Sequence, residues 1–235
     1  MFYFDWTYVV LVMPAILLAM WASSNVNHTF KKYSTQYSRR GITAADAARR
    51  VLDANGLYHV GIERIPGKLT DHFDPRDNVI RLSEDVCDST STAAIGVACH
   101  EAGHAVQYAV GYAPIKIRAA IVPITNIGSR LSMPLILLGL LFSVRSPSLY
   151  WLVYTGIACF GLSALFQLVT LPTEFNASRR ALKAIDSGML LYDDEMVGAR
   201  KTLKAAALTY VAALAVAVTQ LLRLLIIFGR RDNDD

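Results

Sequence analysis

Residues 91–111 read STAAIGVACHEAGHAVQYAVG, and the rest of the chain is best understood from this stretch. Its small and apolar residues predict a helix that begins at Ser91 or Thr92 and ends near Gly111. Within that helix His100 and His104 are four residues apart, about 6 Å along the axis and on nearly the same face. Both imidazoles can therefore reach one metal ion, with the carboxylate of Glu101 beside them.

The pattern H-E-x-x-H is typical of zinc hydrolases, because one helical turn supplies two nitrogen ligands and a carboxylate base. Zinc lowers the pKa of its bound water to about 7, and Glu101 would take the proton as that water attacks a carbonyl. The alternative is an exposed helix that carries two unrelated histidines. The apolar flanks disfavour it, since buried histidines and carboxylates are costly without partners. We therefore expect one Zn²⁺ per chain.

The composition indicates a membrane protein. Of the 235 residues, 54% are hydrophobic, and four apolar stretches are long enough to cross a bilayer. The first lacks the basic start and the cleavage site of a signal peptide, so we expect it to be a retained anchor. The predicted transmembrane segments are residues 2–22, 119–144, 148–171 and 205–228. Between them we expect a cytoplasmic portion with the H-E-x-x-H helix, residues 23–118, and a shorter cytoplasmic segment with the third zinc ligand, residues 172–204.

The orientation in the membrane follows from the distribution of Lys and Arg. These residues are concentrated in the two polar segments, whereas the turn between the second and third spans contains Arg145 alone. The positive-inside bias predicts that both polar segments are cytoplasmic and that both termini are outside. The formal net charge of +4 suits a surface beside anionic lipid. The chain has no recognised nucleic-acid-binding motif, so we expect the lipid bilayer as a partner and no nucleic acid.

Short elements are expected before the H-E-x-x-H helix. Thr43 is a suitable N-cap for a helix that ends at Asn55. The β-branched stretches Tyr58–Ile65 and Val79–Leu82 predict paired strands, and the polar run that contains His72 predicts a loop. Val79–Leu82 is a candidate sheet edge for binding an extended peptide, and the alternative is a core strand that supports the helix. The predicted fold is a mainly α membrane protein with a small α+β zinc-peptidase-like portion.

A catalytic zinc site usually takes three protein ligands and leaves one position open. No histidine follows His104. Three upstream histidines are alternatives for the third ligand: His28, His59 and His72. Glu174 is the strongest candidate, because Pro172 is expected to end the third span and Thr173 to cap a new helix at the membrane face of the H-E-x-x-H helix. Glu174 could instead only complement a helix N-terminus.

The segment Glu174–Ala181, the stretch Leu69–His72, the four spans and the H-E-x-x-H motif together resemble the bacterial YugP-type neutral zinc metallopeptidases, membrane proteins of the broader gluzincin type. This resemblance implies that His100, His104 and Glu174 bind zinc and that Glu101 is the general base. Related membrane gluzincins carry E-x-x-x-D, whereas this chain has a serine at the aspartate position. Another residue must then orient a ligand histidine. The candidates are Asn176, Ser178 and Asp71.

The predicted function is that of a membrane-embedded zinc metalloendopeptidase. It would hydrolyse peptide bonds of membrane or membrane-proximal proteins by Glu101-assisted attack of zinc-bound water, in a multi-pass protein of the bacterial cell membrane with a cytoplasmic active site. The alternatives are an intramembrane-cleaving metalloprotease and a non-catalytic zinc-containing membrane adaptor. An open site with three ligands favours the enzyme, since structural zinc sites have four protein ligands. Four residues are candidates for stabilising the oxyanion: Arg179, Arg180, His72 and Tyr210.

Overall fold

Four helical stretches are long and apolar enough to cross a membrane in the computed structural model, which describes residues 5–229. The predicted start of the first span, at residues 2–4, lies outside the described residues. With a small three-stranded sheet, these helices confirm the prediction of a mainly α membrane protein with a small α+β portion. The four stretches are Tyr8–Tyr33, Ala113–Ser143, Pro147–Ser187 and Asp193–Gly229.

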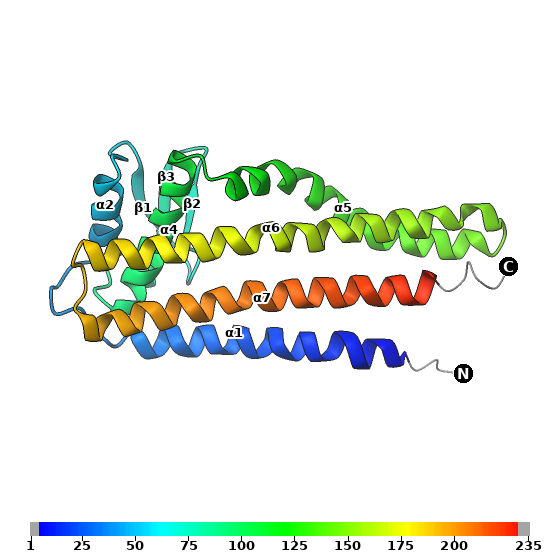
Figure 1. Ribbon diagram of the computed structural model, residues 1–235, viewed down its shortest axis with the longest axis horizontal. Helices are drawn as coiled ribbons and strands as arrows, with labels where there is room; N and C mark the ends of the chain where they lie inside the picture. Colours follow the sequence, from blue (N-terminus) through cyan, green and yellow to red (C-terminus); the bar gives the residue numbers. More distant parts are fainter. Residues whose placement is uncertain (1–4, 230–235) are drawn as a thin grey trace. The chain divides into compact units, whose positions relative to one another are not determined.

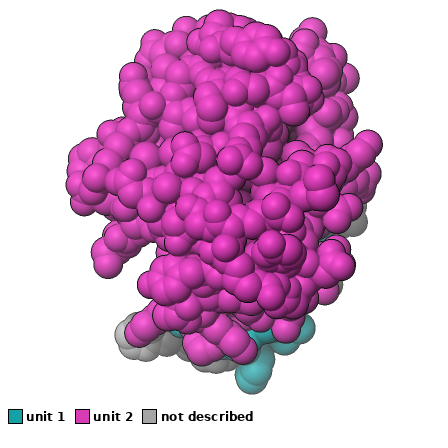
Figure 2. Space-filling view, turned by 90° about the vertical axis from the view of Figure 1, so that its left-hand side faces the viewer, with its two compact units in different colours: residues 1–21, 117–171, 210–235 teal, residues 22–116, 172–209 magenta. Residues whose placement is uncertain are grey.

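The chain divides into two compact units, which are coloured separately in Figure 2. The first comprises residues 1–21, 117–171 and 210–235, and the second comprises residues 22–116 and 172–209. Four long helices contribute residues to both units: α1 (Met13–Tyr33), α5 (Ala113–Ser143), α6 (Trp151–Ser187) and α7 (Asp193–Gly229), labelled in Figure 1. A π-helical turn, Tyr8–Val12, precedes α1, and a 3₁₀ turn, Pro147–Tyr150, precedes α6.

The first unit is a helical bundle with apolar side chains inside and outside. Its buried cluster joins α5, α6 and α7 through Ile136, Val153, Ile157 and Leu224. Large apolar side chains such as Leu137 also cover the exposed side of α5, as lipid-facing helices require. The ion pair between Asp5 and Arg223 joins the N-terminal end of the bundle to α7, with Nε of Arg223 2.8 Å from Oδ2 of Asp5.

Helix α6 continues through Pro172, so the prediction that Thr173 caps a separate helix is wrong. Proline removes only one backbone donor, and packing of the surrounding turns can compensate for that loss. The residues after Pro172 are held firmly, because Thr173, Ala177 and Ala181 are completely buried. The third candidate membrane span and the segment with Glu174 are therefore one continuous helix.

The second unit contains the predicted short elements. Helix α2 (Ala44–Ala54) begins at Thr43, whose side chain accepts a hydrogen bond from the amide of Asp46 at 3.1 Å, as the sequence predicts. It ends before Gly56, which has φ +72°. The helix α4 (Thr92–Ala109) begins at Ser91, whose hydroxyl accepts from the amide of Ala94 at 3.2 Å. A one-turn helix α3 (Glu84–Cys87) precedes it and was not predicted.

The sheet has the strand order β1 (Gly61–Ile65), β3 (Val79–Ser83), β2 (His72–Asp74), with β1 parallel and β2 antiparallel to β3. Val79–Leu82 is therefore a central strand, and its prediction as the peptide-binding edge is wrong. The prediction of a loop at His72 is also wrong. The stretch His72-Phe73-Asp74 has little strand propensity of its own, and it is extended because it pairs with β3.

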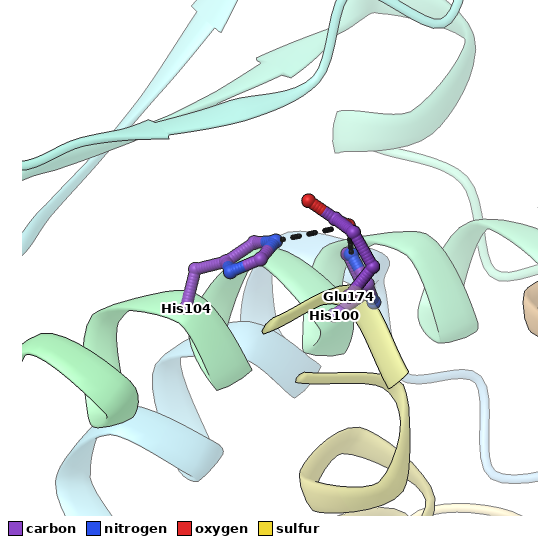
Figure 3. Close-up of side chains that lie close together, drawn as sticks. All are labelled: His100, His104 and Glu174. Atoms are coloured by element: carbon purple, nitrogen blue, oxygen red, sulfur yellow. Dashed lines mark hydrogen bonds and ion pairs between the residues drawn. The ribbon is translucent and has the colours of Figure 1, made fainter. Parts of the chain in front are cut away.

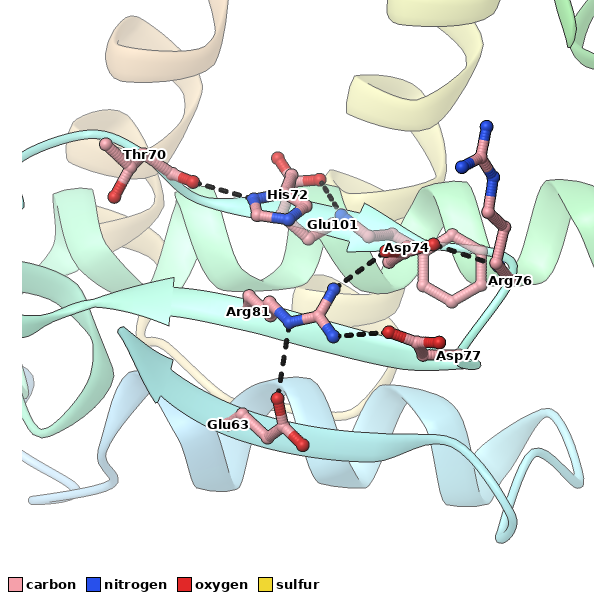
Figure 4. A network of polar contacts seen from close by, with 9 residues as sticks. Glu63, Thr70, His72, Asp74, Arg76, Asp77, Arg81 and Glu101 are labelled. Atoms are coloured by element: carbon pink, nitrogen blue, oxygen red, sulfur yellow. Dashed lines mark hydrogen bonds and ion pairs between the residues drawn. The ribbon is translucent and has the colours of Figure 1, made fainter. Parts of the chain in front are cut away.

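The two faces of the sheet differ in polarity. On one face, Ile80 and Leu82 of β3 join a core that also contains Leu52 of α2 and Ile95 of α4. On the other face, Arg81 of β3 contacts β1, β2 and the turn between β2 and β3 through a polar network, shown in Figure 4. Its guanidinium donates to three carboxylates: Asp74 at 2.8 Å, Asp77 at 2.6 Å and Glu63 at 3.2 Å. The network fixes the register of β2, the strand next to α4.

Candidate metal centre

Helix α4 presents His100 and His104 on one side of the second unit. Their ring centroids lie 4.7 Å apart with the rings nearly perpendicular. Both side chains are mostly buried, with 14% and 11% of their side-chain surface exposed. Glu174 reaches them from α6, as Figure 3 shows. Its Oε2 lies 3.2 Å from Nε2 of His100 and 3.5 Å from Nε2 of His104.

Gly103 explains how α6 comes so close to α4. A Cβ atom added to Gly103 would lie 2.7 Å from the carbonyl oxygen of Ala177, one turn after Glu174. A backbone atom of α6 therefore occupies the space that any larger residue would need. The glycine inside the H-E-x-x-H motif allows the close helix packing that brings Glu174 to the two histidines.

The other ring nitrogens of the histidines have their own partners. Nδ1 of His100 lies 3.1 Å from the hydroxyl of Ser178, and Nδ1 of His104 lies 3.0 Å from Oε1 of Gln107. The amide nitrogen of Gln107 donates to the carbonyl of Thr173 at 2.8 Å and to Oδ1 of Asn176 at 3.0 Å. Oε1 is an acceptor only, so Nδ1 of His104 donates to it. In the neutral ring that binds a metal ion, the lone pair would then be on Nε2. This lone pair faces Glu174, where a metal ion would lie.

Of the three candidates for orienting a histidine, Ser178 contacts His100 directly and Asn176 contacts Gln107. Asp71 does not touch either ring. Its carboxylate accepts from the amide of Ser83 at 2.8 Å and from the hydroxyl of Ser83 at 3.1 Å. Burial raises the pKa of Asp71 above its usual value, even though these hydrogen bonds favour the charged form.

Glu101 lies beside the cluster and contacts the sheet. It is 9% exposed, and its Oε2 accepts a hydrogen bond from the amide of Phe73 in β2 at 3.0 Å. The ring of Phe73 packs against Tyr108 of α4 with centroids 5.6 Å apart, which holds β2 on this helix. Burial raises the pKa of Glu101, while the nearby histidines oppose that shift. The carboxylate is thus positioned and made more basic than a solvent-exposed one.

The cluster is electrostatically suited to a cation. Burial alone would lower the pKa of His104, yet its hydrogen bond to Glu174 and the charge of Glu101 raise it. Two atoms bound to one tetrahedral Zn²⁺ lie roughly 3.4 Å apart, and the two His–Glu separations are 3.2 and 3.5 Å. All three donor atoms lie within 4.8 Å of one another. Two imidazoles and one carboxylate are a donor set that zinc takes, and the two His–Glu separations match its tetrahedral spacing.

The remaining sequence candidates lie elsewhere. Within the described residues, the three upstream histidines do not join the cluster: His28, His59 and His72. His72 is paired with Arg81, on the opposite face of β2 from Phe73, and its Nδ1 lies 2.8 Å from the carbonyl of Thr70. For the oxyanion, Arg179 is exposed and Arg180 donates to Asn176 at 2.8 Å. Tyr210 belongs to the first unit, and its role in stabilising the oxyanion stays a prediction.

Two residues of the site were not identified from the sequence. Gly103 is one of the unspecified positions of H-E-x-x-H. A glycine inside a helix lowers helix stability, so its presence can indicate that another backbone segment packs closely against it. Gln107 is a polar residue on an apolar helix, one turn after His104, and it is completely buried. A buried amide requires hydrogen-bond partners, so its spacing from His104 was an available signal.

The comparisons with known proteins agree with this geometry. Residues 8–229 match the family described as "Putative neutral zinc metallopeptidase". The chain is 43% identical over 228 residues to "Putative membrane protease YugP" of Bacillus subtilis (strain 168), covering 96% of this chain and 99% of that protein. No solved structure matches the chain. The chain therefore belongs to the family described as putative neutral zinc metallopeptidases, and the resemblance noted in the sequence is confirmed.

Proposed function

We propose that this protein is a membrane-embedded zinc metalloendopeptidase that hydrolyses peptide bonds of membrane or membrane-proximal proteins. One observation carries the proposal: His100, His104 and Glu174 place three ligand atoms within 4.8 Å of one another, with Glu101 adjacent on the same helix. Membership of the family and the name of the Bacillus subtilis relative support a protease. One Zn²⁺ per chain would be held by the three residues.

The zinc ion would supply Lewis acidity, activating water and polarising a substrate carbonyl. The protein side chains do the rest. Glu101 takes the proton from the attacking water and delivers it to the leaving amine. The amide of Phe73 holds one oxygen of Glu101 at 3.0 Å, which fixes the direction of the carboxylate. Ser178 and Gln107 orient the rings of His100 and His104 and keep Nε2 directed at the metal position.

The substrate is proposed to bind as an extended peptide along β2. This strand is an edge of the sheet, and the amide of Phe73 on its outer side reaches Glu101. A peptide paired with that edge would place its backbone next to the general base. Endopeptidase action suits such a site, because pairing with an edge strand needs no free peptide terminus.

We further propose that the protein is a multi-pass protein of the bacterial cell membrane with its active site on the cytoplasmic side. Four apolar helices support the membrane location, and the concentration of Lys and Arg in residues 23–118 and 172–204 supports the orientation. A C-terminal fusion to a reporter enzyme that is active only outside the cytoplasm should show activity. A fusion to a reporter that is active only in the cytoplasm should not, and activity of that second fusion would mean that the orientation is the reverse.

The catalytic role is tested by Glu101→Gln, with Glu84→Gln as a control on an exposed carboxylate. Glu101→Gln should keep about one zinc per chain, because Glu101 is not a ligand, and should abolish cleavage. Membrane proteomes of cells with either variant should then differ, with full-length substrates accumulating only when Glu101 is replaced. If zinc is retained and the proteomes are the same, the protein is a zinc-containing adaptor and the proposed activity is wrong.

A further inference from the structure

The second unit contains a cavity of about 410 Å³ between α2, α4 and α6. It is lined by residues of all three helices and of the loop that follows α6. Three of its lining side chains are cationic: Arg50 of α2, and Arg180 and Lys183 of α6. No carboxylate is among the lining residues. This combination makes the potential in the pocket positive.

The cations are largely without counter-ions. Among the described residues, Arg50 and Lys183 form no ion pair. Arg180 uses its Nε to donate to Asn176 at 2.8 Å, which leaves the two outer guanidinium nitrogens directed away from that bond. Arg180 and Lys183 are three residues apart, so they lie on the same side of α6. Like charges held together in this way are stabilised by an anion between them.

The helix ends reduce this charge without cancelling it. The last turns of α2 and α6 line the cavity through Asn55 and Ser187, and each helix C-terminus carries about half a negative charge. Three cations and two such ends leave a net charge of roughly +2. A phosphate monoester carries about −1.5 to −2 at neutral pH, whereas a carboxylate carries −1. The charge of the cavity is therefore matched by a phosphate monoester.

The size and the walls of the cavity indicate a ligand larger than phosphate itself. Cavities that hold small organic molecules measure about 300–1,000 Å³, and this one is within that range. Val51, Val106 and Leu190 supply apolar wall, against which an organic group would pack. We propose that the cavity is a binding site for a small organic phosphate monoester, with the phosphate held by Arg50, Arg180 and Lys183.

The test is calorimetric titration of zinc-loaded protein in phosphatidylcholine nanodiscs with phenyl phosphate. The double variant Arg50→Gln/Lys183→Gln should weaken binding by at least tenfold, because two charge-assisted contacts are lost. Both residues are exposed, so folding should be preserved, and an unchanged melting temperature without ligand checks this. The control is Arg179→Gln, which removes one cation from α6 outside the cavity and should leave the affinity within about twofold.

Three outcomes would overturn the proposal. The first is that wild-type protein does not bind phenyl phosphate. The second is that all three proteins bind it equally, as they would if it bound the metal ion. The third is that benzoate binds as tightly as phenyl phosphate. The source of the phosphate is decided by adding phosphatidic acid to the nanodiscs. Displacement of phenyl phosphate by this lipid identifies a lipid headgroup, and undisturbed binding identifies a soluble ligand. Both results support the phosphate site, and neither depends on peptidase activity.

Discussion

Replacement of Gly103 by Ala should separate Glu174 from the two histidines. The added Cβ would lie 2.7 Å from the carbonyl oxygen of Ala177. Ordinary C···O contacts are about 3.3–3.6 Å, so the helices must move apart by roughly 0.6 Å. The opposing atom belongs to the backbone of α6 and cannot rotate away. Glu174 is on the same helix, one turn earlier, and moves with it.

The loss of zinc affinity in Gly103→Ala depends on whether the overlap with Ala177 is present with or without the metal ion. Metal–ligand distances tolerate only about 0.2 Å, which is less than the required movement. Without metal, α6 can relax away from α4, and Ala gains about 1 kcal/mol in helix propensity over Gly. Metal binding would force the overlap to return, at about 1–3 kcal/mol for overpacking. The propensity gain is present in both states and cancels, so zinc affinity should fall by about 5- to 150-fold.

Chelator competition on purified protein measures this affinity, and Gly96→Ala is the matched control. Gly96 is also inside α4, but its added Cβ would lie 3.2 Å from Cα of Ala199 in α7, away from the metal ligands. That variant should bind zinc within about twofold of the wild type. Equal zinc affinities for Gly103→Ala and Gly96→Ala would refute the role of close α4–α6 packing.

Three further predictions concern the residues around the proposed metal ligands. Gln107→Leu should weaken zinc binding by about 10- to 100-fold in the same competition assay, because His104 loses its Nδ1 acceptor; wild-type affinity would contradict this. Ser178→Ala should have a smaller effect, and Ser178→Asp should bind zinc at least as tightly as the wild type, since a carboxylate is a stronger acceptor for Nδ1 of His100. The difference in stability between Asp71→Asn and the wild type should change in favour of the variant as pH rises. The raised pKa of Asp71 means that the folded wild-type protein binds more protons than the unfolded one and loses stability from about pH 4 upward through the folded pKa. Melting temperatures at pH 4 and pH 7 measure this difference, and a constant difference would exclude it.

The elements that could be predicted from the sequence are those whose signals are local. Helix α4 begins at Ser91 and α2 at Thr43 because each side chain accepts a hydrogen bond from an amide three residues later. These contacts depend on neighbouring residues only. The four apolar helices are equally local, since length and hydropathy decide them. The juxtaposition of His100 and His104 follows from helix geometry alone.

The elements that could not be predicted depend on contacts distant in the sequence. Pro172 is a strong local signal for a helix end, yet α6 continues because its next turns are buried. His72-Phe73-Asp74 has no local strand signal and is extended by pairing with β3. Its position matters for the site, because the amide of Phe73 holds Glu101. The partners of the histidines also come partly from α6. No spacing within α4 indicates Ser178, which was a candidate only through the resemblance to the E-x-x-x-D pattern.

These errors share one physical cause, which is packing between segments distant in the sequence. They did not affect the expectation that Glu174 lies beside the two histidines. The helix break expected at Pro172 and the continuous helix observed both bring Glu174 to the end of the apolar span, so the prediction did not depend on which was correct. What decides the distance to the histidines is the space between α4 and α6. That space is set by small residues at the contact, Gly103 and Ala177. In this chain one of the two unspecified positions of H-E-x-x-H is therefore constrained: Gly103 determines whether Glu174, the proposed third ligand, can reach the two histidines.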